Sequence, residues 1–434
     1  MSNKTRTTAM NNVKPMSTPK LRFPEFREAA EWEETQLIKI ARPVVDRAVT
    51  GDGDKVLSLS AEHGLVLQSD YFGKKIAGDS AERYLKLVRD DFVYNDRTTK
   101  ASAYGTIKRL SKYDGGIVSP IYKCFRFNSH ENPVFWEWHF ESGSHEAQLS
   151  SLVNEGARAG RFNISISQFL NTFALRPDEP EQKKIADCLT SIDELTAAQV
   201  RKVEALKAHQ KGLMQQLFPG EGETRPRFRF AEFQDAEQWE KRTLDELAHV
   251  QSGATPSKGN PEFWNGSIPW VSAKDMKRLF LDEAEDHISV AAINDGARLV
   301  PPGTILVLTR GMTLLKDVPI CLLLREMSFN QDVKGLRPKS GVGGPFLAWM
   351  LTSNKDRLLR MVDIAGHGTG KLNTDELKAL DLVLPKPLEQ QRIAECLTAL
   401  DNLIVAQTLK LDALTAHKSG LMQQLFPSME EVEA

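Results

Sequence analysis

The sequence lacks any run of about 18 consecutive apolar residues, the length that a helix needs to cross the hydrocarbon core of a membrane. Its first twenty residues are polar and rich in Thr, Asn and Lys, without the apolar stretch of a secretory signal. We therefore expect a cytoplasmic protein that has no membrane partner. Residues 1–19 are predicted to form a flexible N-terminal tail.

Cysteine is scarce, and charge of one sign is not in excess. The four cysteines contain no C-x-x-C pair and no histidine cluster accompanies them, which excludes the ligand spacing of a zinc site. We predict reduced, mostly buried thiols and no bound metal. The formal net charge of -2 argues against a chain that coats nucleic acid by bulk attraction, but it is compatible with local basic patches. The cysteines are Cys124, Cys188, Cys321 and Cys396.

The signatures of a self-contained DNA-modifying enzyme are also missing. An amino-methyltransferase needs an N/D-P-P-F/Y motif, but the nearest strings, at 132–135 and 260–263, lack the second proline and are interpreted as turns. A phosphate-binding loop needs glycine at 365 and Ser or Thr at 372, where Ala365 and Leu372 stand. No strand-borne pair of acids with a lysine suggests a nuclease. We predict a non-catalytic chain that binds no cofactor itself.

An internal repeat organises the chain. Residues 181–219 and 389–427 align without a gap at an offset of 208 and are identical at 24 of 39 positions, including the ending GLMQQLFP. A weaker repeat at offset 207 relates segments near the start of each half, so the duplication spans whole halves. Its residues are Arg22, Phe23, Glu25, Phe26, Trp32, Glu33 and Leu37, matched by Arg229, Phe230, Glu232, Phe233, Trp239, Glu240 and Leu244.

Each strongly repeated segment is predicted to be one long helix. It follows a proline region and ends at Pro219 or Pro427, and about 35 helical residues would span roughly 50 Å. Apolar residues at alternating spacings of three and four predict a coiled-coil seam. In the first copy the seam is Ile185, Leu189, Ile192, Val203, Leu206, Leu213 and Leu217, interrupted by Thr196, Gln199 and Gln210; in the second it is Ile393, Leu397, Leu400, Ile404, Leu411, Leu414, Leu421 and Leu425, interrupted by Gln407 and Lys418.

A two-fold repeat would pack these helices antiparallel and place the variable domains at opposite ends; the alternative is two unrelated helices, each packed on its own domain. The variable regions are expected to be mixed α/β domains. The predicted order is variable domain 20–180, helix 181–219, variable domain 220–388, helix 389–427 and tail 428–434. Strands are predicted at 56–59, 92–94, 116–122, 268–271, 304–309 and 320–324, and helical stretches at 81–89 and 346–362.

These motifs, in this order, resemble the specificity subunit of type I restriction-modification enzymes over residues from about 20 to 427. The proline-led openings Glu181-Gln182 and Glu389-Gln390 are similar to that family's central and distal conserved regions. The first half adds Gly115-Gly116-Ile117-Val118-Ser119-Pro120-Ile121-Tyr122. The second half adds Ser252-Gly253 with Thr255-Pro256, then Ile268-Pro269-Trp270-Val271, Pro302-Gly303-Thr304-Ile305-Leu306 and Asn330-Gln331.

The resemblance implies two target recognition domains, each contacting one half of a bipartite, asymmetric site in double-stranded DNA. It implies that the antiparallel helices set the spacing and dock two methyltransferase subunits, which in turn recruit restriction and translocase subunits. S-adenosylmethionine, ATP and Mg are then expected on the partner subunits. Two other classes stay open: a coiled-coil adaptor that does not read DNA, and a stand-alone DNA methyltransferase or nuclease fragment.

Candidate DNA-binding residues are basic side chains near loops, where cations can meet phosphates. A merely solvated basic surface is the alternative for the first half. The tryptophans Trp136, Trp138, Trp264 and Trp270 are interpreted as core or interface anchors. The candidates are Lys100, Lys108, Arg109 and Lys112 in the first variable domain and Lys258, Lys274, Lys277, Arg310 and Lys371 in the second.

Overall fold

The computed structural model describes residues 18–49, 55–72, 81–99, 102–152, 163–364 and 368–427. The chain folds as two compact units: unit 1 comprises residues 1–199 and 410–434, and unit 2 comprises residues 200–409. The boundaries fall inside the two long helices, so each unit takes one half of each helix. Lys100 lies outside the described residues, as do the predicted tails except for residues 18 and 19.

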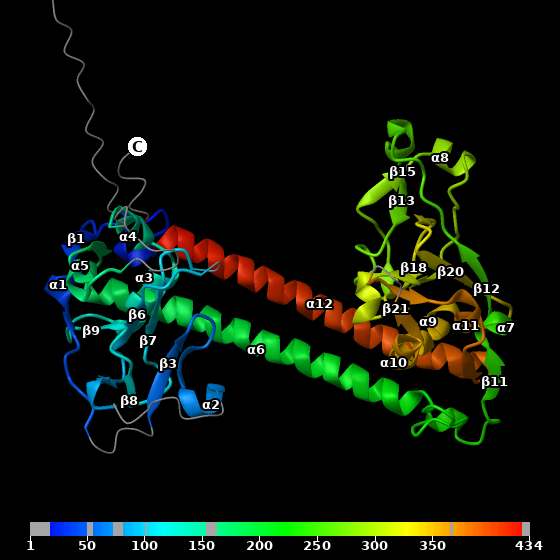
Figure 1. The fold of residues 1–434 in the computed structure, drawn as a ribbon, viewed down its shortest axis with the longest axis horizontal. Helices are drawn as coiled ribbons and strands as arrows, with labels where there is room; N and C mark the ends of the chain where they lie inside the picture. The colour runs from blue at the N-terminus through cyan, green and yellow to red at the C-terminus, as the bar shows by residue number, and fades with distance from the viewer. Residues whose placement is uncertain are drawn as a thin grey trace, which may run out of the picture. The chain divides into compact units, whose positions relative to one another are not determined.

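The two repeated segments form the long helices α6 (Glu179–Leu217) and α12 (Pro387–Leu425), each of 39 residues (Figure 1). Both begin and end two residues earlier than predicted. The prediction placed Pro180 and Pro387 before the helices, whereas both lie in the first turn. Proline is tolerated there because a first-turn N–H has no partner within the helix.

Unit 1 contains two four-stranded sheets and a separate strand pair. One sheet has the order β2 (Ala41–Pro43), β9 (Lys123–Phe127), β6 (Phe92–Asn95), β7 (Thr106–Arg109) and is antiparallel throughout. The other has the order β4 (Gly64–Leu67), β3 (Val56–Ser60), β8 (Gly115–Val118), β5 (Leu85–Val88). The strand pair joins β1 (Glu33–Gln36) to β10 (Phe173–Arg176).

The main core of unit 1 is aromatic and includes the ends of both long helices. α3 (Pro133–Glu141) places Phe135, Trp136 and Phe140 against the sheet that contains β9, and the ring of Trp136 stacks on Phe127 with centroids 4.8 Å apart. The same core contains Ile185 and Leu189 from the start of α6 and Leu425 from the end of α12. Within unit 1 the two helices therefore run antiparallel.

Unit 2 is built around a five-stranded sheet with the order β12 (Ala248–Ser252), β20 (Val333–Pro338), β16 (Ile305–Leu308), β18 (Ile320–Leu323), β14 (Phe280–Leu281). Two three-stranded sheets accompany it: β15 (Asp286–Ile288), β13 (Ile268–Val271), β19 (Ser328–Phe329), and β17 (Arg310–Gly311), β22 (Gly370–Leu372), β21 (Val362–Ile364). A strand pair joins β11 (Glu240–Thr243) to β23 (Asp381–Leu384).

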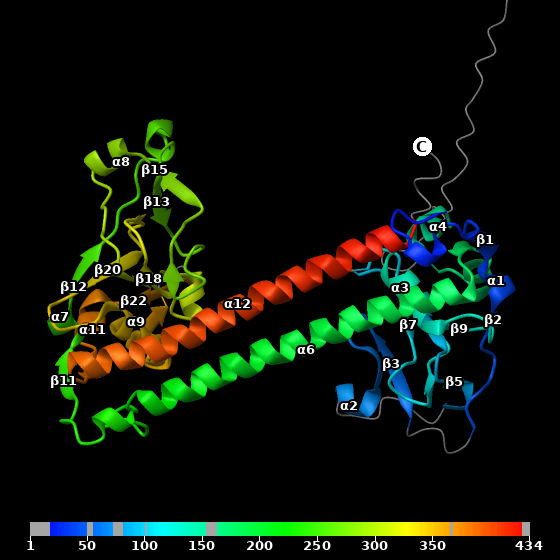
Figure 2. The ribbon, with the colours of Figure 1, turned by 180° about the vertical axis from the view of Figure 1, so that it is seen from behind.

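The apolar helix α9 (Gly344–Ser353) packs on β18 and β20, followed by α10 (Lys355–Arg360). The core under α9 includes Ile393 and Leu397 from the start of α12 and Leu217 from the end of α6, so the helices are antiparallel in this unit too. In both views, β13, β15 and α8 (Val290–Asn294) lie at the end of unit 2 farthest from the start of α12 (Figures 1 and 2).

The repeat is visible as matching contacts at the start of each long helix. Arg22 pairs with the buried Glu181 in unit 1, and Arg229 pairs with the buried Glu389 in unit 2. The adjacent glutamines contact the residue before an earlier helix: Gln182 accepts a hydrogen bond from the backbone N–H of Asn132, before α3, and Gln390 from that of Gly343, before the helix Gly344–Ser353. The repeated Glu-Gln dipeptide therefore ties the start of each helix to its own unit.

The seam positions are the buried side of both helices. Among the exposed apolar side chains of the helices, Leu195, Leu388 and Leu409 all lie off the predicted seam. Eight seam residues are buried, namely Ile185, Leu189, Val203, Leu217, Ile393, Leu397, Ile404 and Leu425. Seven are half-buried, namely Ile192, Leu206, Leu213, Leu400, Leu411, Leu414 and Leu421.

Two residues that interrupt the seam form polar pairs at positions related by the repeat. In unit 1 Lys418 contacts Asp193, and its ammonium group lies 4.5 Å from the ring centroid of Trp138. In unit 2 Gln210 donates a hydrogen bond of 3.2 Å to Asp401. The offset of 208 relates Asp193 to Asp401 and Gln210 to Lys418. Unit 1 thus has an ion pair at this place, whereas unit 2 has a hydrogen bond from a neutral amide to a carboxylate.

Several predicted elements differ in the structure. The predicted helix 81–89 is wrong: a single 3₁₀ turn at Ala81–Arg83 is followed by β5, which pairs with β8. The predicted strand 116–122 stops at Val118. The predicted helical stretch 346–362 starts earlier and is divided into α9 and α10, with Asn354 between them, and Val362 already belongs to β21. The other five predicted strands are confirmed within a residue at either end.

Candidate nucleic-acid interface

One edge of the five-stranded sheet in unit 2 gathers several polar loops. Antiparallel pairing places Ser252 opposite Lys334 and Leu308 opposite Val333, so the ends of β12 and β16 lie beside the start of β20. The connections that leave this edge are 253–267, 309–319, which includes β17, and 330–332. Loops at one edge of a rigid sheet are a common location for binding residues.

The first of these loops is held close to the sheet by a glycine. A Cβ atom at Gly253 would lie 2.3 Å from the carbonyl oxygens of Phe329 and Asn330, so only glycine permits this approach. The N–H of Ala254 donates to the Phe329 carbonyl at 2.9 Å, and the indole N–H of Trp270 donates to the Ala254 carbonyl at 3.1 Å. Three of the family-like phrases in the sequence therefore meet at one place.

This packing brings together two side chains that are 76 positions apart in the sequence. The hydroxyl of Thr255 donates a hydrogen bond to the amide oxygen Oε1 of Gln331, and Gln331 is exposed. The bond fixes the oxygen of the amide, and among the described residues no hydrogen bond from its N–H groups is found. A side-chain amide held in this way has the donor and acceptor pattern that pairs with adenine in the major groove.

The two strongest basic candidates of the second half stand opposite one another. Arg310 on β17 is the register partner of Lys371 on β22, and both side chains are exposed. The Arg310 N–H donates to the backbone carbonyl of Asp332 at 3.2 Å, which links this pair to the loop that carries Gln331. Asp363 faces Lys371 from the other neighbouring strand. Within the described residues, neither Arg310 nor Lys371 forms an ion pair.

A third cation lies at the same edge. Lys334 donates a hydrogen bond of 2.7 Å from its ammonium group to the Ser252 hydroxyl. Burial lowers the pKa of Lys334, and the positive charge of Arg310 lowers it further, whereas the negative charge of Asp332 opposes the shift. Arg310 and Lys334 repel each other, and an anionic ligand such as a phosphate would relieve that repulsion.

The remaining candidates of the second half lie elsewhere on unit 2. Lys258 is exposed on the 253–267 loop, within which the indole N–H of Trp264 donates to the Ser257 carbonyl. Lys274 forms ion pairs of 3.0 Å with both Glu285 and Asp286. Lys277 is exposed. Of these three, Lys258 belongs to the edge described above, because its loop leaves the sheet beside Gly253.

The first-half candidates have intramolecular partners. Lys108 pairs with Glu141, and Arg109 pairs with Asp90 and Glu137, whose pKa burial raises although Arg109 opposes the shift. The ammonium group of Lys112 donates to the His63 carbonyl at 2.8 Å. The charges of Lys108 and Arg109 are thus balanced by Asp90, in the turn between β5 and β6, and by two acids of α3. That these residues bind DNA stays a prediction.

Sequence reasoning did not select Thr255, Gln331 or Lys334 as DNA-binding candidates. Thr255 and Gln331 were present only as parts of family-like phrases, and Lys334 lies in a strand. Their position in three dimensions identifies them, because all three lie at the sheet edge that carries Arg310. The tryptophan interpretation is confirmed for Trp136 and Trp270, which are buried.

The strings that superficially suggested an enzyme have local structural roles. Asn132 caps α3 by accepting hydrogen bonds from the N–H groups of Val134 and Phe135, and Asn260 caps the 3₁₀ helix Pro261–Trp264. Lys371 and Gly370 belong to β22. Over the described ranges, no group of three or more His, Cys, Asp or Glu residues is arranged to hold a metal ion. Over those same ranges, no helix has both the length and the apolar character to cross a membrane.

Comparison with known proteins gives consistent matches. The sequence pattern of the type I restriction modification DNA specificity domain matches residues 236–415. The chain is 31% identical over 235 residues to the EcoR124I/EcoR124II type I restriction enzyme specificity subunit of Escherichia coli, covering 52% of this chain and 54% of that protein. It is 30% identical over 171 residues to the MjaIX specificity subunit of Methanocaldococcus jannaschii, covering 38% of each. The chain thus spans about half, or less, of the length of these relatives.

Solved structures share the fold over nearly the whole chain. The S subunit of a type I restriction-modification system from M. genitalium has a TM-score of 0.58 at 14% identity, covering 95% of this chain and 100% of that one. A chain from a study of complex assembly and conformational transition of the type I R-M system has a TM-score of 0.54 at 17% identity, covering 91% and 97%.

The fold defines a mixed α/β protein of two units with an internal repeat and two long helices. The sequence comparisons add that residues 236–415 match the type I restriction modification DNA specificity domain and that the chain is similar to type I restriction enzyme specificity subunits.

Proposed function

We propose that this chain reads a bipartite, asymmetric site in double-stranded DNA as the specificity subunit of a type I restriction-modification complex. Each unit contacts one half-site. In unit 2 the contact is made by the sheet edge that carries Arg310, Lys371, Gln331 and Thr255. Cations on this surface bind phosphates and fix the register, whereas the amide and hydroxyl groups meet base edges.

The observation that supports this most directly is the combination of groups at that edge. Arg310 and Lys371 are exposed, opposite in register and without ion pairs among the described residues, and the Thr255 hydroxyl orients Gln331 beside them. This edge lies within the 236–415 segment that matches the specificity domain. A surface that combines phosphate-binding cations with an oriented amide is suited to sequence-dependent binding of a duplex.

The helices serve as the spacer and dock in this proposal. Half-sites read from one face of a duplex are separated by about one helical turn, roughly 34 Å, or a multiple of it. Helices of 39 residues have lengths of about 58 Å at 1.5 Å per residue, which is sufficient for that range. The exposed faces of the helices dock two methyltransferase subunits, which recruit the restriction and translocase subunits.

The chain itself is non-catalytic in this proposal. S-adenosylmethionine, ATP and Mg bind to the partner subunits, and this chain contributes only the position of those subunits on the DNA. Loss of the chain therefore abolishes the sequence selectivity of methylation, while the methyltransferase subunit keeps its own active site.

The test is to coexpress the chain with its cognate methyltransferase subunit and to map methylated adenines across the host genome by single-molecule sequencing. The expected result is a split motif of two short half-sites around a fixed gap, lost when the chain is omitted. Methylation by the isolated chain would favour an enzyme. Binding of the methyltransferase with no chain-dependent motif would favour an adaptor.

A further inference from the structure

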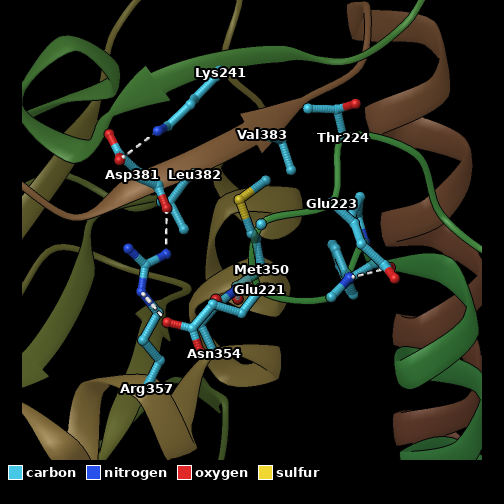
Figure 3. A pocket seen from close by; sticks show the side chains of 14 residues that line it. Glu221, Glu223, Thr224, Lys241, Met350, Asn354, Arg357, Asp381, Leu382 and Val383 are labelled. Atoms are coloured by element: carbon cyan, nitrogen blue, oxygen red, sulfur yellow. Dashed lines mark hydrogen bonds and ion pairs between the residues drawn. The ribbon is translucent and has the colours of Figure 1, made fainter.

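The loop that follows α6 lies beside two hollows in unit 2, and Glu221 lines both. Figure 3 shows the first of them. The first hollow has an apolar floor that includes Met350, Leu382 and Val383. The second is rimmed by basic side chains. These are Lys211, Arg227, Lys355, Arg357 and Arg360.

The carboxylate of Glu221 lies between two arginine side chains. Its Oε2 lies 2.6 Å from Nη2 of Arg360, and its Oε1 lies 3.8 Å from Nε of Arg357. Arg357 is itself fixed, because its Nη1 donates a hydrogen bond of 2.7 Å to the backbone carbonyl of Asp381 (Figure 3). The side chain of Glu221 remains 64% exposed. Arg357 is therefore oriented in advance for a carboxylate, whereas Arg360, whose side chain is 61% exposed, has Glu221 as its ion-pair partner.

Two glycines give the backbone around Glu221 conformational freedom. Glycine flanks it on both sides, and Gly222 has a φ of +81°, a left-handed conformation that suits glycine. A Cβ atom at Gly222 would meet nothing within 4 Å. Glu223 closes the turn by accepting a hydrogen bond of 3.0 Å from the Gly220 N–H. Glu221 can thus leave the arginines by rotation at two glycines, without breaking a packed core.

The arginine pair is a feature of unit 2 and does not belong to the repeat. Residues 128–157 of the first half, which include α3 and α4 (Glu146–Ser151), contain no lysine or arginine. A ligand of this pair therefore binds once per chain, unlike a partner that docks identically on both units.

We propose that Arg357 and Arg360 form a docking site for an acidic segment of a partner protein, with Glu221 as the internal competitor. A carboxylate of the partner replaces that of Glu221 between the arginines, and an adjacent apolar side chain covers Met350. A protein is favoured over DNA because the apolar lining of the first hollow, which includes Met350, suits an apolar side chain and offers a phosphate backbone nothing to bind.

The experiment uses the full chain labelled with ¹³C at its methionine methyl groups, because Met350 lies in the first hollow. A Met350→Leu variant assigns its signal among the eleven methionines. The probe is a capped hexapeptide of alternating glutamate and leucine, and the control is the same peptide with glutamine. We expect a saturable shift of the Met350 signal with the acidic peptide only, and its loss in Arg357→Gln and Arg360→Gln.

The Glu221→Gln variant gives the decisive readout. Removal of an exposed internal competitor should tighten binding of the acidic peptide by about two- to fivefold. The matched control Glu223→Gln, in the same loop but outside the arginine pair, should leave the affinity unchanged. Equal binding of both peptides, or no gain in Glu221→Gln, would overturn the proposal. A short DNA duplex that shifts Met350 and displaces the peptide would assign the site to nucleic acid instead.

Discussion

Arg229 donates two hydrogen bonds of 2.7 Å to the carboxylate of Glu389, and both side chains are at least nine-tenths buried. The Nη1 group of the same arginine donates to the Ala236 carbonyl, so the pair ties the start of α12 to the segment before β11. Arg22 and Glu181 repeat the arrangement in unit 1, with distances of 2.8 and 2.7 Å. This bidentate pair explains why Arg and Glu recur at these positions in both halves.

Replacing one residue of the Arg229–Glu389 pair should destabilise the protein much more than replacing both. Glu389→Gln leaves a buried, unpaired guanidinium and is expected to lower the free energy of unfolding by about 3 kcal/mol or more. Arg229→Met combined with Glu389→Leu should recover most of that loss. Urea unfolding at pH 7 measures both. An equal loss in the single and double variants would contradict the assignment, and Lys386→Gln, which breaks an exposed ion pair with Glu240, is the surface control.

The repeat itself suggests a stabilising substitution in the seam. Gln210 faces Asp401 where the other copy pairs Lys418 with Asp193, and burial raises the pKa of Asp401. Gln210→Lys should create the missing ion pair, raise the free energy of unfolding by up to about 1 kcal/mol, and lower the pKa of Asp401. The gain should vanish when Asp401→Asn is added. Thermal unfolding at low salt measures it, and a gain that survives Asp401→Asn would point to helix propensity instead.

Unit 1 should lose stability in mild acid because of two buried histidines. Burial lowers the pKa of His139 to about 3 and that of His145 to about 4, and both rings lie among aromatic side chains of the core. The unfolded chain takes up these protons near pH 6.5, before the folded chain does. The contribution of these neutral histidines to stability is therefore fully present above about pH 6.5, and the free energy of unfolding falls as the pH drops toward 4. Unfolding measured between pH 7 and 4 should show a shallower decline in His139→Phe than in the unmodified chain.

Phosphate contacts at the sheet edge should appear in the salt dependence of DNA binding. Lys371→Ala and Arg310→Ala are each expected to weaken binding of the methyltransferase complex to its duplex and to reduce the salt slope by about one. Binding titrations from low to moderate salt measure this. Lys39→Ala, an exposed cation on α1 (Leu37–Ile40), is the control and should leave the slope unchanged. Unchanged slopes for both test variants would remove this edge from the interface.

Base reading by Gln331 should appear in the methylated motif. Gln331→Ala is expected to relax preference at one position of one half-site, a loss of discrimination of about 1 to 3 kcal/mol, while the other half-site and the gap stay unchanged. Thr255→Val should have a smaller effect at the same position, because it only frees the amide to rotate. Methylome mapping reads both variants. A motif identical to that of the unmodified chain would show that Gln331 reads no base.

The sequence predicts local features of this protein better than features that depend on residues far apart in the chain. The long helices and their seam were predictable because a helix repeats its buried positions every three or four residues, and the two copies reinforce the pattern. The strand β5 was mistaken for helix because its conformation is set by pairing with Gly115 and Gly116 on β8, a contact that no local pattern shows.

The candidate interface shows the same limit. The sequence displays Lys108 and Arg109 as a basic cluster but not the carboxylates of Asp90, Glu137 and Glu141 that pair with them from other elements. In the second half Arg310 and Lys371 were selected, yet their opposition across two strands depends on β22 pairing with β17. Thr255 and Gln331 meet only because Gly253 permits a close approach to β19.

The sequence by itself determined the duplication, the two helices and their buried stripes, because these depend on spacing along the chain. It also determined which family the motifs resemble. Only the tertiary structure decided which cations are paired within the protein and which remain exposed at one sheet edge. Ion pairs, register and close backbone approaches join residues that are distant in sequence, and their energies depend on position in space.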